Sequence, residues 1–488
     1  MRRQTTLAAL GVAAFTLALR IPTLSEPRWY YDEAVFTTIA WATSKGMTLY
    51  VGVFDLQPPG IFWLYRLLLA LGGLEHHFVV QLGVSVFVLA TALLTFAIAR
   101  RVVELWPATL AGLLTGFALS LPLLDGDLLN VELGASPFFL AALLLAFSRR
   151  WPAVFASGLL LGVALAFRPS FVVDCVAVLV PLLSTGRREL RVVMLGLGVL
   201  VTLAIALWGL WLEGSLAAYF NVVAPTDRLY LVNGNRGTLF PVVVRLAIFG
   251  AVAAVGLIRA KTTGGRLMAL WLPASIAGAT LTPKGYVHFV HETIPPLALG
   301  LAMLVGRYRL RWLTAPGAAI ALVLCAYAVV VVPPMQVAVM THRVPLELWD
   351  SIGSDPNYYV NWFAYASGAK SYDEYAAWFW DVAPRERELT RLRGLAPASG
   401  RLQVIGPQPW LYIESGLLPA TPYLNTTDLW VPTAKEETRS RLRGGCADVV
   451  VAPTQLIKWQ DDLRFAGYVP VGGTPWPTFV AATHRSCD

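Results

Sequence analysis

Long apolar runs, separated by short polar loops, dominate the first 334 residues of the chain. Runs of this length with few charges are typical of helices that cross a bilayer, because about 20 residues span its hydrocarbon core. The pattern predicts an all-α polytopic membrane domain with about eleven transmembrane helices. They are expected near residues 5–22, 78–99, 107–124, 131–147, 152–167, 170–184, 192–212, 241–258, 267–282, 289–305 and 314–334.

The loops between these runs carry clusters of Arg and Lys, which are enriched in cytoplasmic loops of membrane proteins. The clusters lie at residues 2–3, 100–101, 149–150, 187–191, 259–266 and 307–311. Since an even number of crossings must join successive clusters, the N-terminus is predicted to be cytoplasmic and the C-terminal part extracytoplasmic. The same parity predicts that residues 61–71 form an interfacial helix on the outer surface of the membrane.

The composition changes after residue 334, where aromatic, proline and charged residues replace the apolar runs. Two short segments rich in β-branched residues, 402–405 and 448–451, are typical of strands among polar helices. We therefore expect two domains, a transmembrane domain at 1–334 with an outer catalytic loop at 23–77, and an extracytoplasmic α/β domain at 335–488. Cys446 and Cys487 fall in that outer domain, where a disulfide is chemically permitted, although sequence alone leaves their pairing open.

Composition supports the membrane assignment and removes one class of partner. The chain is 56% hydrophobic and 14% charged, with a mean hydropathy of +0.60, whereas soluble domains are about 25% charged. Its net charge of +8 would suit a nucleic-acid-binding protein. The positive excess lies in the loops of the first 334 residues, however, so it indicates topology and no nucleic-acid partner.

The most informative polar residues lie in the loop at 23–77. Asp32 and Glu33 directly follow the aromatic run 29–31, and Asp55 precedes a Pro-Pro-Gly turn at 58–60. An isolated Asp-Glu pair more often caps a helix. Here the aromatic anchors and the turn predict a loop folded onto the membrane surface, where a partly desolvated carboxylate can act as a general base.

Cations for an anionic ligand are available at the same predicted surface. Arg168 lies at the turn between two short spans, and Lys284 and His288 lie where two later spans meet. Each can alternatively extend to lipid headgroups, which for Arg168 alone is equally favoured. If the segment after residue 284 is helical, Lys284, His288 and Glu292 share a face.

Two further carboxylates fall near these cations. Asp174 lies one to two turns into a span, where pairing with a cation is its expected role. Glu132 stands at the start of the fourth span and either caps that helix or faces the same cavity; the sequence leaves both open.

These motifs resemble the GT-C membrane glycosyltransferases, specifically the bacterial branch related to protein O-mannosyltransferases and the lipid A aminoarabinose transferase. The matching segments follow in the family's order and cover most of the chain: 20–22, 31–33, 49–50, 54–60, 130–132, 167–169, 284–288 with 295–296, and 410–421. The resemblance implies a sugar donor on a polyprenyl phosphate, inversion at the anomeric carbon, and Asp32 as the base. The family usually has Lys before Pro-Pro, where this chain has Gln57.

The residues and the resemblance together predict a membrane glycosyltransferase that moves a sugar to an extracytoplasmic acceptor hydroxyl. Asp32 and Glu33 are the predicted catalytic residues, and Arg168, Lys284, His288 and Gln57 the predicted phosphate-binding residues. Asp55, Glu132 and Tyr286 are further candidates, and a divalent cation is an open possibility as cofactor. The expected partners are the lipid-linked donor, membrane lipids and a glycan, lipid or protein acceptor.

Two other functions compete with this prediction. A transporter or flippase of a lipid-linked sugar would line a translocation path with Asp174, Arg168 and Glu292. A non-catalytic scaffold would bind sugars through the aromatic residues of its outer domain. Polar residues gather at one predicted membrane face instead of the midplane, which favours the transferase.

Overall fold

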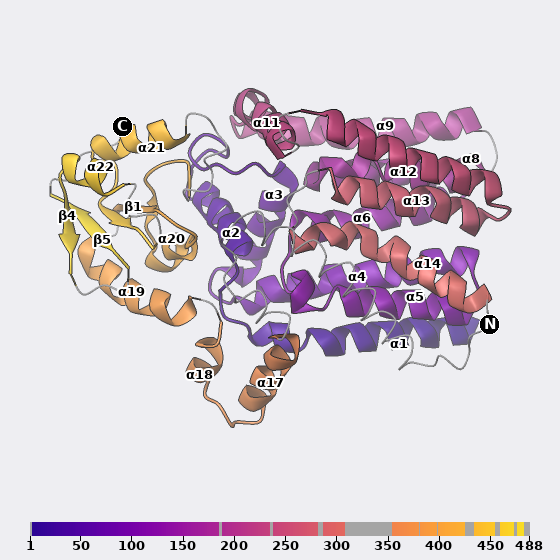
Figure 1. Ribbon diagram of the computed structural model, residues 1–488, viewed down its shortest axis with the longest axis horizontal. Coiled ribbons are helices and arrows are strands. Elements are labelled where there is room, and N and C mark those ends of the chain that lie inside the picture. Colours follow the sequence, from indigo (N-terminus) through magenta and orange to yellow (C-terminus); the bar gives the residue numbers. More distant parts are fainter. Residues whose placement is uncertain are drawn as a thin grey trace.

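The computed structural model describes residues 2–184, 188–234, 238–281, 286–307, 354–379, 381–397, 399–424, 434–453, 459–472 and 476–482. The predicted span at 314–334 and the boundary at 334/335 lie outside these residues. Within them, a bundle of roughly parallel and antiparallel helices is joined at one end by a smaller α/β part that contains the C-terminal strands (Figure 1).

The predicted spans correspond closely to helices in the bundle. They are α1 (Arg2–Arg20), α4 (Phe78–Val102), α5 (Leu105–Ala118), α6 (Val131–Ala146), α7 (Trp151–Phe167), α8 (Cys175–Leu183), α9 (Arg188–Leu212), α12 (Phe240–Arg259), α13 (Thr263–Ala279) and α14 (Ile294–Arg307). In the described part of the chain, five helical segments are long and apolar enough to cross a membrane, and several others are shorter apolar helices. The membrane character is thus confirmed, whereas the number of eleven spans stays a prediction.

Close approach of small residues holds part of the bundle together. A Cβ added at Gly158 in α7 would lie 2.1 Å from the Leu195 carbonyl oxygen of α9, and one at Gly198 would lie 2.3 Å from the Phe155 carbonyl oxygen. Glycines at such positions let two helix backbones approach closely, which drives helix packing in lipid. This contact fixes α7, and with it the turn that carries Arg168.

Short helices cover the end of the bundle that faces the α/β part. They are η1 (Pro22–Ser25), α2 (Tyr31–Ser44), α3 (Pro59–Leu68), η2 (Leu69–Gly73), η3 (Pro122–Leu124), η4 (Pro169–Val172), α10 (Leu216–Ala218), η5 (Tyr219–Val223), α11 (Ala224–Gly234) and η6 (Val287–Thr293). Segment 61–71, predicted as a surface helix, corresponds to α3 and η2.

The α/β part contains one mixed five-stranded sheet with the order β2-β1-β3-β5-β4. Its strands are β1 (Arg401–Val404), β2 (Leu418–Pro419), β3 (Val449–Val451), β4 (Tyr468–Val471) and β5 (Thr478–Ala481). Its helices are α17 (Ser354–Ala366), α18 (Tyr372–Ala376), α19 (Val382–Leu395), α20 (Trp410–Ser415), α21 (Ala434–Arg443) and α22 (Gln460–Phe465). The two predicted strands are confirmed as β1 and β3, which pair in parallel.

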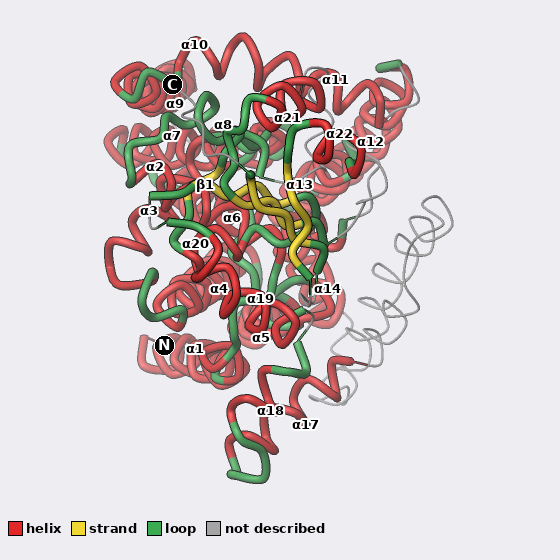
Figure 2. Tube along the Cα trace, turned by 90° about the vertical axis from the view of Figure 1, so that its left-hand side faces the viewer, coloured by secondary structure: helices red, strands yellow, loops and turns green. Residues whose placement is uncertain are grey.

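The central strands β1 and β3 are buried on both faces, with Gln403 and Val450 on the face opposite to Leu402 and Val404. Leu402 and Val404 of β1 lie opposite Val449 and Val451 of β3, and all four side chains are fully buried. Two-sided burial is typical of strands covered by helices on both faces. Figure 2 views this part from its outer side, with the sheet over the bundle and α17 and α18 projecting beyond it.

Cys446 is disulfide-bonded, and Cys487 lies outside the described residues.

Candidate active site

A cavity of about 570 Å³ lies at the end of the bundle beneath the α/β part. It brings together seven of the residues singled out from the sequence, although they come from five separate segments of the chain. These are Asp32, Asp55, Gln57, Glu132, Arg168, Tyr286 and His288. Lys284, predicted beside them, lies outside the described residues.

Helix α2 presents Asp32 and Glu33 to different surroundings. Asp32 lines the cavity, whereas Glu33 is 2% exposed and bonds to His77 and, at 3.4 Å, to the Gln81 amide. Both carboxylates stand in the first turn, where the helix dipole favours negative charge. Desolvation raises the pKa of Asp32, and the negative charge of Asp125 adds to this, while His288 opposes it. A raised pKa in a cleft is typical of a general base.

The turn at 55–60 brings Asp55 and Gln57 to the cavity wall. Asp55 accepts a hydrogen bond from the Gln57 backbone N–H at 2.9 Å, and desolvation raises the pKa of Asp55 to about 7. Pro59 begins α3 in the position that proline favours. A Cβ at Gly60 would lie 2.8 Å from the Ala166 carbonyl oxygen, so glycine here lets α3 dock against the end of α7.

Arg168 follows α7 in an extended conformation, which the next residue, a proline, favours. Its guanidinium bonds to Glu132, lies 3.4 Å from a Glu292 carboxylate oxygen, and sits 4.6 Å from the centre of the Phe289 ring. Arg168 is thus held by paired carboxylates and an aromatic face. This is an ordered, partly buried cation in the cavity wall, unlike a side chain extended to headgroups.

The two interpretations of Glu132 are separated by its neighbour Asn130. The Asn130 side chain accepts the Leu133 backbone N–H at 2.8 Å and so caps α6. Glu132 is fully buried and faces Arg168 in the cavity wall.

A smaller chamber of about 260 Å³ adjoins the cavity and shares Tyr31, Asp32, Tyr286 and His288 with it. Its wall adds Asp125, whose carboxylate lies 3.0 Å from His288 Nδ1. Asp125 has a left-handed backbone conformation, with φ of 54°, which is uncommon for a residue with a side chain. The pair orients the His288 ring, which also lines the larger cavity.

The predicted helical face of Lys284, His288 and Glu292 stays a prediction, because Lys284 lies outside the described residues. The segment is the 3-10 helix η6, in which His288 pairs with Asp125 and Glu292 lies beside Arg168. Glu292 and Asp174 meet below Gly278, where an added Cβ would lie 2.8 Å and 3.4 Å from their carboxylate oxygens. Their two carboxylates therefore lie close together beneath the cavity.

Within the described part of the chain, no three His, Cys, Asp or Glu residues are arranged so that they could hold a metal ion.

The α/β part closes over the loop that carries Asp32. Trp410 Nε1 donates to the Tyr30 carbonyl at 3.1 Å, the Thr38 hydroxyl donates to the Pro409 carbonyl at 3.1 Å, and the Phe54 N–H donates to the Pro422 carbonyl at 2.8 Å. These three hydrogen bonds tie the loop, at Tyr30, Thr38 and Phe54, to the α/β part.

Two acidic residues of the cavity walls were missed by the sequence interpretation: Asp125 and Asp227. Asp125 stands in an Asp-Gly-Asp segment, a turn signal that could have been noticed. Asp227 stands in α11, whose sequence neighbours give no sign that it reaches the cavity.

Comparison with known proteins gives one family match. The model of the dolichyl-phosphate-mannose-protein mannosyltransferase family matches residues 56–211, about the first half of the helical bundle. A search of curated proteins found no match.

Solved structures of similar shape extend over nearly the whole chain. The crystal structure of ArnT from Cupriavidus metallidurans bound to undecaprenyl phosphate superposes with a TM-score of 0.62 at 12% identity, covering 98% of each chain. The apo form of that protein gives 0.60 at 12% identity, covering 96% of this chain and 97% of that one. The oligosaccharyltransferase AglB from Archaeoglobus fulgidus, in complex with an inhibitory peptide and a dolichol-phosphate, gives 0.50 at 11% identity, covering 98% and 74%. The predicted resemblance to GT-C membrane glycosyltransferases is confirmed at the level of the fold.

Proposed function

We propose that this protein is a membrane glycosyltransferase that moves a sugar from a polyprenyl-phosphate donor to an acceptor hydroxyl with inversion at the anomeric carbon. The observation that carries the proposal is the convergence of Asp32, Arg168 and His288 on one cavity. It places a desolvated carboxylate and two cationic or hydrogen-bonding groups around one space. The mannosyltransferase family match and the shared fold with a protein bound to undecaprenyl phosphate support the donor class.

In this mechanism Asp32 accepts the proton of the acceptor hydroxyl as that oxygen attacks the anomeric carbon. The bond between the anomeric carbon and the phosphate oxygen breaks, and its electron pair leaves with the polyprenyl phosphate. Attack opposite the departing phosphate inverts the configuration. Positioned proton transfer of this kind typically contributes about 10² to 10⁴ in rate.

Arg168 and His288 stabilise the negative charge that grows on the departing phosphate. Because Glu132 and Glu292 already pair with Arg168, its guanidinium is oriented before the donor binds. Gln57 lines the same wall as an uncharged hydrogen-bonding group, and Lys284 is proposed to add a cation there. Asp55 and Tyr286 complete the pocket around the sugar. Glu33 instead holds α2 in place through its bond to His77.

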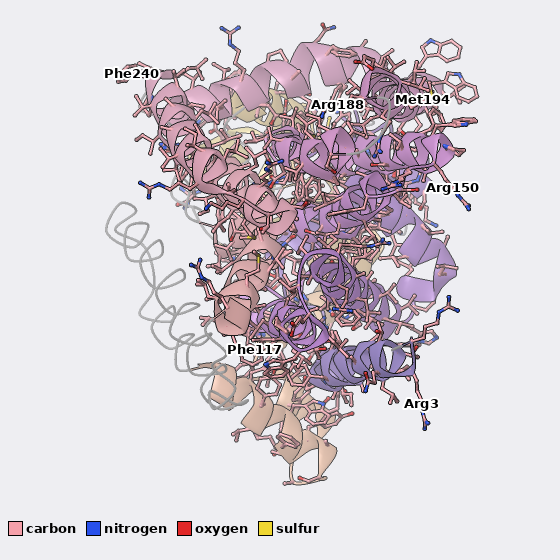
Figure 3. All side chains as sticks on the ribbon, turned by 90° about the vertical axis from the view of Figure 1, so that its right-hand side faces the viewer. Arg3, Phe117, Arg150, Arg188, Met194 and Phe240 are labelled. Atoms are coloured by element: carbon pink, nitrogen blue, oxygen red, sulfur yellow. The ribbon has the colours of Figure 1, made fainter. Side chains whose placement is uncertain are left out.

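The proposed orientation places the cavity and the α/β part, with residues 335–488, outside the membrane, and the N-terminus in the cytoplasm. Figure 3 looks onto the opposite end of the bundle, where the labelled Arg3, Arg150 and Arg188 lie. Arginines at that end support a cytoplasmic location for it.

Mass spectrometry of lipids that co-purify with the protein tests the donor class. We expect a polyprenyl phosphate or its glycosylated form, reduced in an Arg168→Met variant. Membrane phospholipids alone, together with no binding of added polyprenyl phosphate, would contradict the proposal. Transport of a lipid-linked sugar without transfer, measured in proteoliposomes, would support the flippase function instead.

A further inference from the structure

A second cavity, of about 520 Å³, lies on the other side of the loop that carries Asp32. None of its lining residues lines the cavity described above. Its walls come from residues 24–28, from the turn 75–78 before α4, and from α17, α18, α19 and α20. It therefore lies at the junction between the helical bundle and the α/β part.

Aromatic rings with accessible faces stand at this cavity. Tyr372 is 45% exposed and its ring lies 5.8 Å from that of Tyr365, while Phe78 is 50% exposed and its ring lies 6.0 Å from that of His76. Exposed aromatic faces in a polar surrounding can pack against the apolar face of a sugar ring, as the tyrosine hydroxyl keeps its contact with water.

The arginines of the cavity are already paired. The buried Arg385 donates to the Glu414 carboxylate at 2.7 Å and to the Arg28 carbonyl, and the Arg28 guanidinium lies 4.0 Å from the same carboxylate. Glu75 and Glu386 add two exposed carboxylates. The lining therefore carries no net positive charge and disfavours an anionic ligand such as a phosphate, whereas hydroxyl groups of a neutral ligand can donate to the exposed carboxylates.

His77 lines the second cavity and contacts α2, the helix that carries Asp32. One ring nitrogen of His77 bonds to Glu33, and the other lies 3.1 Å from the Glu26 carbonyl oxygen. Glu33 is adjacent to Asp32 in the first turn of α2. The two cavities thus flank the same helical turn, one on each side.

We propose that this second cavity binds an uncharged sugar unit of the acceptor, and hence that the acceptor is a glycan. The inference rests on the proposed transferase function, since it assigns the acceptor class for that reaction. A unit held remotely from the reacting hydroxyl contributes binding energy that orients the acceptor at Asp32. Stacking on Tyr372 is the contact expected to contribute most.

The test uses the purified full-length protein in lipid nanodiscs and five neutral oligosaccharides: mannotriose, maltotriose, galactotriose, arabinotriose and chitotriose. Saturation-transfer NMR should show saturable binding of at least one of them. Tyr372→Ala should weaken that binding by about five- to ten-fold, as expected for loss of an aromatic contact. His76→Trp, at an exposed position, should narrow the cavity and weaken the binding.

Phe363→Ala is the matched control, because Phe363 is a 61% exposed aromatic on α17 that does not line the cavity. It should bind the oligosaccharide as the wild type does. Absence of binding for all five sugars, or binding unchanged in both cavity variants, overturns the inference. Binding of polyprenyl phosphate, measured in parallel, separates the two proposals: its absence alongside intact sugar binding refutes the transferase function only.

Discussion

Variants of the ion pair between Arg168 and Glu132 can separate its contribution to protein stability from the role of Arg168 in donor binding. Glu132 is fully buried and Arg168 has 11% of its side chain exposed, so neither charge is well solvated without the other. Arg168→Met keeps the length and apolar character of the side chain but leaves the Glu132 carboxylate without its cation. Loss of one partner of a buried pair typically destabilises a protein by about 3 to 5 kcal/mol.

The double variant Arg168→Met/Glu132→Gln removes the Arg168–Glu132 pair and should recover part of that stability, because neutral replacements of a buried pair are often close to neutral while the buried Glu292 still lacks its cation. Donor binding should not recover. A charge-assisted hydrogen bond to phosphate contributes about 1.5 to 3 kcal/mol, so polyprenyl-phosphate affinity should fall by about ten- to a hundred-fold in both variants.

The assay combines unfolding of each variant in the same detergent with a titration of polyprenyl phosphate. Glu132→Gln alone is the control, since it leaves Arg168 with Glu292 as its partner. If Arg168→Met unfolds like the wild type, the burial argument is wrong. If the double variant is stable and binds the lipid with wild-type affinity, Arg168 does not hold the donor phosphate.

Three further predictions concern charge and topology. His288→Gln should move the acid limb of the kcat/KM profile to higher pH, because His288 lowers the pKa of Asp32 and the base must be ionised; an unmoved limb would mean that ionisation of Asp32 does not control the rate. Gln57→Lys should tighten polyprenyl-phosphate binding by adding a cation to the cavity wall, and unchanged affinity in a titration would place the phosphate elsewhere. A membrane-impermeant thiol reagent applied to intact cells should label a cysteine at the exposed Lys45 but not one at the exposed Thr262, and the opposite pattern would invert the proposed topology.

The sequence predicted the elements of the bundle well because each span is a long apolar run whose length is set by the membrane. Ends were less accurate: the span expected to continue to residue 124 ends as α5 at Ala118, since the following turn with Pro122 and Asp125 breaks the helix. The strands β1 and β3 were predicted because both segments are short and rich in β-branched residues.

The site was predicted in its residue types but not in its pairings. Polar residues at the ends of apolar runs indicated Asp32, Glu132 and Arg168, yet nothing in the sequence showed that Glu132 contacts Arg168 across 36 residues. The partnership of His288 with Asp125 depends on the left-handed turn at Asp125. Such long-range contacts are set by helix packing, which local periodicity does not encode.

Transfer of sugar from a purified polyprenyl-phosphate donor by wild type and Asp32→Asn tests the central claim most directly. The amide keeps the shape of the side chain and its place in the first turn of α2, but it cannot accept the hydroxyl proton. Turnover should fall by about 10² to 10⁴ while polyprenyl-phosphate affinity stays at the wild-type value. Turnover within a few-fold of the wild type, in a variant that binds the lipid normally, would contradict Asp32 as the base and reduce it to a helix-terminal carboxylate.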